Sequence, residues 1–115
     1  MIKPTKKSLQ NITPHNLGES LHSVIFNPED AGINKNLLIL TKSQLNPEKD
    51  FDWHVHDDFD EIFITISGEG TVEFKDGTSF EFKAGDTVNC PAKLEHRIIN
   101  SSKSPIEFYF IRLAS

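Results

Sequence analysis

Apolar and polar residues alternate along most of this chain, with the two-residue period of β-strands. The run at residues 61–67 (EIFITIS) is typical of a strand, and two further alternating runs, 71–75 and 78–83, flank Asp76-Gly77. An Asp-Gly dipeptide between alternating apolar runs is the strongest short-range signal of a β-hairpin. No window keeps a 3.6-residue apolar period for three turns, so the pattern predicts no helix.

The same criteria predict short strands at nearly even spacing through the rest of the chain. The expected strands cover residues 21–26, 37–41, 51–56, 61–67, 71–75, 78–83, 87–90, 94–100 and 106–113. Many short strands separated by turns indicate an all-β sandwich or barrel. Residues 1–20 show no clear period, so we expect an N-terminal arm or lead-in there and one β-barrel domain over 21–115.

Composition and charge narrow the classes of partner. A chain of 115 residues is one small domain, and its net charge of −5 argues against nucleic acid, whose phosphates need a basic face. No apolar run approaches the ~20 residues of a membrane span. A single cysteine, Cys90, excludes an internal disulfide, and the N-terminal residues lack the apolar core of a secretory signal. We therefore expect a cytoplasmic location.

Three of the five histidines stand in a spacing that suits a metal ion. His54 and His56 lie two residues apart in the expected strand FDWHVH, so they share one face at a separation of about 6–7 Å. Two imidazoles placed in this way can bind one ion at roughly 2.0–2.2 Å each. Glu61 opens the next strand and His96 lies on a distant strand, so only a rolled sheet brings all four together.

The faces opposite these residues are too apolar for water. Alternation places Phe51, Trp53 and Val55 opposite the histidines, and Ile62, Ile64 and Ile66 opposite Glu61. The N-terminal strands or a second subunit could cover these outer faces, because large exposed apolar patches are rare on monomers.

The two groups of ligands resemble the two motifs of the cupin family. The first motif has His-x-His, three or four residues, Glu, six residues and Gly. Here it is His54-Val55-His56, four residues, Glu61, six residues and Gly68. The second motif has Gly, five residues, Pro-x-Gly, two residues, His, three residues and Asn. Here it is Gly85, five residues, Pro91-Ala92-Lys93, two residues, His96, three residues and Asn100.

Two glycines of the family pattern are replaced. Glu48 stands six positions before the first histidine, and Lys93 stands at the glycine of Pro-x-Gly. Because glycine readily adopts a positive φ, we expect the turn at Ala92-Lys93 to differ in shape from the family's turn.

The resemblance implies a double-stranded β-helix, a conical antiparallel barrel with a metal inside, and makes a homodimer the expected assembly. It assigns the ligands to His54, His56, Glu61 and His96, with Asp60 as the alternative carboxylate. Three imidazoles and one carboxylate suit divalent Fe, Mn, Ni, Co or Zn, and no other cofactor is indicated. The positions left open on the ion favour a small-molecule ligand with oxygen donors.

These residues predict a metal-dependent enzyme acting on a small oxygenated metabolite, by dioxygenase, isomerase, decarboxylase or lyase chemistry. The alternatives are a non-catalytic metabolite-binding or sensor protein, and a protein acting on phosphorylated sugars. No residue stands out as catalytic, and Cys90 is interpreted as a small buried hydrophobe. The expected cavity wall comprises Phe63, Thr65, Val88, Cys90, Ile98 and Phe108 or Phe110.

Overall fold

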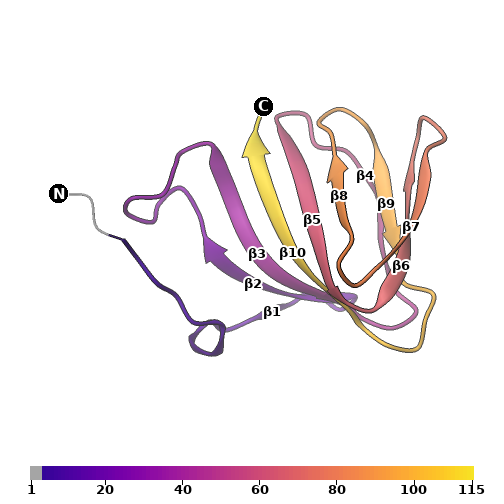
Figure 1. Ribbon diagram of the computed structural model, residues 1–115, viewed down its shortest axis with the longest axis horizontal. Helices are drawn as coiled ribbons and strands as arrows, with labels where there is room; N and C mark the ends of the chain where they lie inside the picture. Colours follow the sequence, from indigo (N-terminus) through magenta and orange to yellow (C-terminus); the bar gives the residue numbers. More distant parts are fainter. Residues whose placement is uncertain (1–3) are drawn as a thin grey trace.

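Strands make up most of the computed structural model, which describes residues 4–115 (Figure 1). A short 3-10 helix, η1 (Leu9–Asn11), precedes them. The strands are β1 (His15–Asn16), β2 (Ser20–Phe26), β3 (Leu37–Leu45), β4 (Asp50–His54), β5 (Phe59–Ser67), β6 (Glu69–Phe74), β7 (Ser79–Lys83), β8 (Thr87–Cys90), β9 (His96–Ile99) and β10 (Ile106–Ala114). Within residues 4–115 there is no α-helix, and hence no helix that could cross a membrane.

The strands form two antiparallel sheets. One has the order β1-β2-β3-β10-β5-β8 and the other the order β4-β9-β6-β7. Figure 1 shows the smaller sheet beside the β5 and β8 end of the larger sheet, while β2 and β3 extend away from it. The all-β prediction is confirmed, and part of the larger sheet's concave face is left without an opposing sheet.

An aromatic cluster fills the space between the sheets. Phe63 and Phe108 are fully buried, and their rings meet edge to face with centroids 5.3 Å apart. Phe82 and Phe110 pack against the same pair. Burial of one such ring stabilises the fold by up to about 3 kcal/mol. This gain determines which of the alternating residues of β5 and β10 face the core.

A bulge in β4 overturns one expectation about its faces. From Phe51 to His54 the chain advances by one residue more than its partner strand, because Phe51 pairs with Ile98 and His54 pairs with His96. An extra residue reverses the alternation. Phe51 therefore packs inward against Phe108 and Phe110, and its prediction as an outer-face residue is wrong.

Part of the N-terminal segment, for which the sequence predicts no strand, forms strand structure. Residues 15–16 form β1, which pairs with β2, and β2 begins at Ser20. Because β1 and β2 extend the larger sheet, side chains between residues 17 and 24 line the same concavity as the strands of the barrel.

Both positions that replace a family glycine have the backbone conformation that glycine favours. Glu48 has φ 61° and Lys93 has φ 70°, so the prediction of a differently shaped turn at Ala92-Lys93 is wrong at the level of φ. The turn is held because the Lys93 N–H donates to the His56 carbonyl, at 2.7 Å. It thereby joins the second motif to the loop that carries His56.

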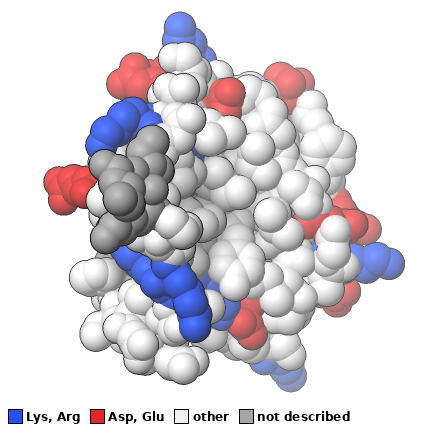
Figure 2. Space-filling view, turned by 60° about the vertical axis from the view of Figure 1, so that its left-hand side comes forward, with Lys and Arg blue, Asp and Glu red and all other residues white. Residues whose placement is uncertain are grey.

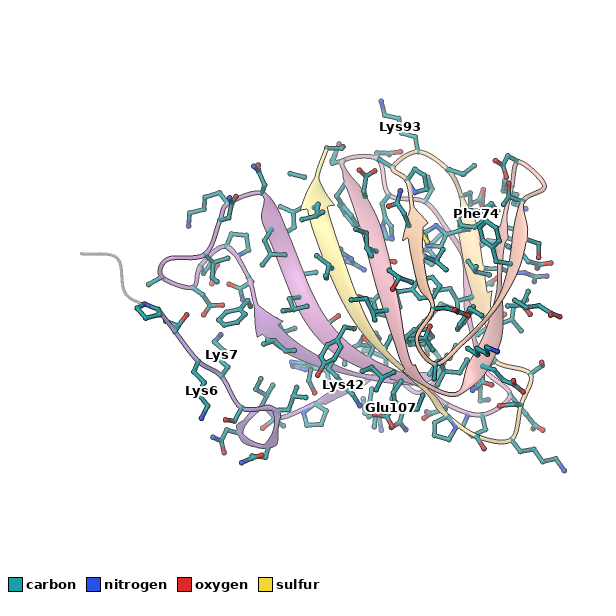
Figure 3. All side chains as sticks on the ribbon, in the orientation of Figure 1. Lys6, Lys7, Lys42, Phe74, Lys93 and Glu107 are labelled. Atoms are coloured by element: carbon teal, nitrogen blue, oxygen red, sulfur yellow. The ribbon has the colours of Figure 1, made fainter. Side chains whose placement is uncertain are left out.

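Replacing Lys93 with glycine is expected to stabilise the protein by roughly 0.5–1 kcal/mol. A left-handed backbone costs a non-glycine residue about 1–2 kcal/mol, and the greater freedom of glycine in the unfolded chain offsets part of this gain. The Lys93 side chain projects away from the molecule, so its loss removes little packing (Figure 3). Urea unfolding measures the change. Ala92→Gly is the matched control and should destabilise, because Ala92 has no positive φ.

Candidate metal centre

Four side chains from separate elements converge at one end of the barrel. His54 ends β4, His56 follows in the loop, Glu61 lies on β5 and His96 begins β9. One nitrogen or oxygen from each lies within 4.8 Å of those of the others. The pairing of β4 with β9 sets His54 opposite His96, with ring centroids 4.3 Å apart.

The chemistry of these atoms fits a divalent ion. Nε2 of His56 and Nε2 of His96 are buried and have no hydrogen-bond partner within the described residues. They lie 3.9 and 3.8 Å from the Glu61 carboxylate oxygens, too far for hydrogen bonds. An ion between these atoms would satisfy groups that otherwise incur an uncompensated desolvation cost.

The tautomer of His54 is compatible with the same role. Its Nδ1 lies 2.6 Å from the Asp52 carbonyl oxygen, which can only accept, so Nδ1 carries the proton. Nε2 is then the unprotonated nitrogen. Fixing one ring nitrogen through a backbone carbonyl in this way is the usual means of orienting a metal-binding histidine.

Arg112 is the residue at this site that sequence reasoning left unassigned. It pairs with Glu61 across β10 and β5, and its Nε donates to Glu61 Oε2 at 2.8 Å. Burial alone would raise the pKa of the Glu61 carboxyl, but His96 and Arg112 together lower it to about 2. Glu61 is therefore a carboxylate throughout the physiological range.

The alternative carboxylate has a different position. Asp60 Oδ1 accepts a hydrogen bond from the Ala92 N–H at 2.8 Å, and Asp60 is not among the converging side chains.

Cys90 is 1% exposed, and burial raises the pKa of its thiol to about 12. It is a buried hydrophobe, as predicted, with too little thiolate to act as a nucleophile.

A cavity of about 430 Å³ opens beside this cluster, on the side where β2 and β3 extend past the smaller sheet. The molecule is hollowed when seen from that side, and its surface there is largely uncharged (Figure 2). The lining residues are Leu17, Glu19, His22, Val24, Ile39, Thr41, Phe51, Asp52, His54, Glu61, Ile98, Phe110 and Arg112.

Most of the residues predicted to line the cavity lie in the core instead. Ile98 and Phe110 line it as predicted. The predicted wall residues Phe63, Thr65, Val88, Cys90 and Phe108 do not, because they lie in or against the packed core between the two sheets. Strands β2 and β3 supply the wall in their place, and their position on the larger sheet has no local signal in the sequence.

The metal-free protein is expected to lose stability in two steps as the pH falls. Burial lowers the pKa of His56 and of His22, so the unfolded chain binds more protons below the ordinary value of 6.5 and stability declines there. Glu61 adds stability that is fully present above pH 4.5 and is lost as the pH falls toward 2. Urea unfolding at a series of pH values measures this. Glu61→Gln should reduce the lower step and retain the upper step.

Comparison with known proteins agrees with this architecture. The family model described as "Cupin domain" matches residues 42–112. The uncharacterized protein YdbB of Bacillus subtilis is 42% identical over 48 residues, and this match covers 42% of each protein. The chain therefore aligns with less than half the length of that relative.

Two solved structures show the same fold over nearly the whole chain. A predicted oxalate decarboxylase from Thermotoga maritima has a TM-score of 0.87 at 21% identity, covering 96% of this chain and 100% of the other. A conserved protein with a double-stranded β-helix domain from Klebsiella pneumoniae has a TM-score of 0.74 at 22% identity, covering 96% and 90%. The double-stranded β-helix prediction is confirmed, and the chain belongs to the cupin domain family.

Proposed function

We propose that this protein binds one divalent transition metal through His54, His56, Glu61 and His96 and acts as an enzyme on a small oxygenated metabolite. The observation that carries the proposal is the pair of buried, unpartnered Nε2 atoms of His56 and His96, which face the ionised Glu61 carboxylate. A cavity of ligand size reaches His54 and Glu61.

The chain's own residues supply binding, orientation and exclusion of water. A bound divalent ion would act as a Lewis acid toward oxygen donors and lower the pKa of bound water. Phe51, Ile98 and Phe110 give the cavity an apolar wall, which lowers the local dielectric and strengthens electrostatic contacts with a ligand. Four protein ligands leave positions open on a six-coordinate ion, as in catalytic sites and not in closed structural sites.

Metal content tests the proposal directly. Protein purified without a histidine tag should take up about one equivalent of Zn(II), Co(II), Mn(II) or Fe(II), measured by elemental analysis after gel filtration. A ligand that binds only the folded state raises the midpoint of thermal unfolding, by an amount that grows with free metal. Uptake below a tenth of an equivalent for every metal would refute the metal centre.

One observation favours a non-catalytic binding protein as the second candidate. His22 is the histidine of the cavity outside the cluster, and both of its ring nitrogens are engaged. Nδ1 lies 2.6 Å from Ser43 Oγ and Nε2 lies 2.9 Å from Ser20 Oγ, and both serines are fully buried. A histidine held on both sides is poorly placed as a proton acceptor. A metabolite recovered unchanged after prolonged incubation with the metal-loaded protein would favour this reading over an enzyme.

A homodimer through the outer face of the larger sheet is part of the same proposal. Ile64 and Ile66 are 36% and 40% exposed on β5, and Tyr109 pairs with Ile64 from β10. Sedimentation equilibrium at micromolar concentration should give twice the chain mass. Ile64→Glu should give monomers that still bind metal, because it places a charge in the interface and lies on the face opposite Phe63. A wild-type mass equal to one chain would remove the dimer.

A further inference from the structure

We propose that the ligand of this cavity is an organic monocarboxylate whose carboxylate is received by the guanidinium of Arg112. The inference rests on the proposed function, since it places this carboxylate beside the metal bound by Glu61. Among ligands with oxygen donors, the expected one is a singly charged acid with an apolar substituent.

Arg112 is held in place while keeping donors available. Its Nε is committed to Glu61 Oε2 at 2.8 Å, and the guanidinium carbon lies 5.0 Å from the centre of the Phe59 ring. The printed contact with Glu61 is at the Nε edge of the guanidinium, and the side chain lines the cavity and is 40% exposed, so part of the group is open to a ligand. A guanidinium held in this way and exposed to the cavity matches the planar geometry of a carboxylate.

The other charges of the cavity limit the ligand to one negative charge. Glu19 and Asp52 also line the cavity, and neither forms an ion pair with Arg112 among the described residues. With a divalent ion bound, these two carboxylates, Glu61 and one guanidinium sum to zero net charge. A monoanion brings the sum to −1, and each further negative charge adds repulsion from Glu19 and Asp52.

The remaining walls favour an apolar group on the acid. Apolar residues from the turn before β2, from β2 and from β3 line the cavity together with residues of β4, β9 and β10: Leu17, Val24, Ile39, Phe51, Ile98 and Phe110. A volume of about 430 Å³ exceeds what a two-carbon acid would fill. An acid with an aromatic or branched aliphatic substituent would bury that surface.

A purely structural role for Arg112, in orienting Glu61, makes a different prediction. That role would affect metal affinity but would not distinguish a charged ligand from a neutral one. Selectivity between a carboxylate and its amide is therefore the readout that separates the two roles. Mandelate and mandelamide are suitable probes, because they share an aromatic ring and a chelating hydroxyl and differ in charge.

The experiment uses zinc-loaded wild-type protein, so it does not depend on the folding of a variant. The chain has two arginines, Arg97 and Arg112, and Arg97 lies outside the cavity in an ion pair with Glu73. Two Nε–H signals are therefore expected in a ¹⁵N correlation spectrum, and Arg97→Lys assigns them. Mandelate should shift the Arg112 signal and leave the Arg97 signal in place, while mandelamide should shift neither.

Variants supply the quantitative test. Wild-type protein should prefer mandelate to mandelamide by at least about tenfold in Kd by calorimetry, as for a charge-assisted hydrogen bond. Arg112→Gln should reduce the preference by at least about tenfold, to what the zinc ion alone contributes, and the matched control Arg97→Gln should retain it. Mandelate binding that leaves the Arg112 signal unmoved, or a preference of unchanged size in Arg112→Gln, would overturn the inference.

Metal uptake and ligand selectivity distinguish failure of the metal centre from failure of the monocarboxylate inference. Absence of uptake of every divalent metal tested by wild-type protein refutes the proposed function and this inference with it. Stoichiometric zinc with equal affinity for the two probes, or with no affinity for mandelate, refutes the monocarboxylate inference and leaves the metal centre intact.

Discussion

An H96A protein is expected to bind zinc or cobalt more than about 100-fold more weakly than the wild type while keeping its fold. His96 supplies one of the two buried Nε2 atoms that face Glu61, and losing a direct ligand should exceed the 10–100-fold typical of losing an outer-shell contact. Competition with a chromophoric chelator measures the affinity. Near-ultraviolet circular dichroism checks that the aromatic packing survives.

The size of the histidine side chain requires a second variant. His96 is 1% exposed, so alanine leaves a cavity that could loosen the barrel for reasons unrelated to metal. His54→Ala removes a more exposed ligand and should cause a similar loss of affinity with less effect on stability. His15→Ala is the matched control, because His15 is exposed on β1 and lies outside the cluster. Full metal content in both ligand variants would contradict the assignment.

The features that could be predicted from the sequence depend on local periodicity and on the spacing of residues along the chain. Alternation on β5 and β10 follows from burial of one face, and Asp76-Gly77 forms the turn expected between β6 and β7. The paired histidines, the acidic residue on the following strand and the later histidine converge because closure of the barrel leaves them one common interior point.

The features that could not be predicted depend on pairing between distant strands. Arg112 meets Glu61 only because β10 lies beside β5, a neighbour 51 residues away in sequence. The bulge that turns Phe51 inward is an insertion relative to β9, so strict alternation within β4 could not reveal it. The sequence predicts a turn of different shape at Lys93, but the hydrogen bond from its N–H to the His56 carbonyl holds the positive φ regardless of residue type.

Asn100 closes the second motif, and its role is structural. Its side-chain Nδ2 donates to the carbonyls of Leu45, Asn46 and Ser104 at 3.2, 3.1 and 2.8 Å. Its Oδ1 accepts from the N–H and hydroxyl of Ser102. One buried amide thus ties the end of β9 to the end of β3, just before the strand that carries His54.

An N100A protein is therefore expected to lose about 3–5 kcal/mol of stability. Each buried carbonyl or N–H left without a partner costs roughly 1–3 kcal/mol, and local relaxation recovers part of the sum. Urea unfolding of the metal-free protein measures the loss, and Asn89→Ala, at an exposed position on β8, should change stability by less than about 0.5 kcal/mol.

The two largest effects should be separable. Asn100 contributes no atom to the metal cluster, so N100A should still take up one equivalent of zinc at a temperature where it is folded. Bound metal should then raise its unfolding midpoint, because only the folded state assembles the four ligands. His54→Ala should show the opposite combination, with unfolding close to wild type without metal and little gain on adding it. Loss of zinc uptake in folded N100A would mean that the amide controls the ligand geometry as well as the strand connection.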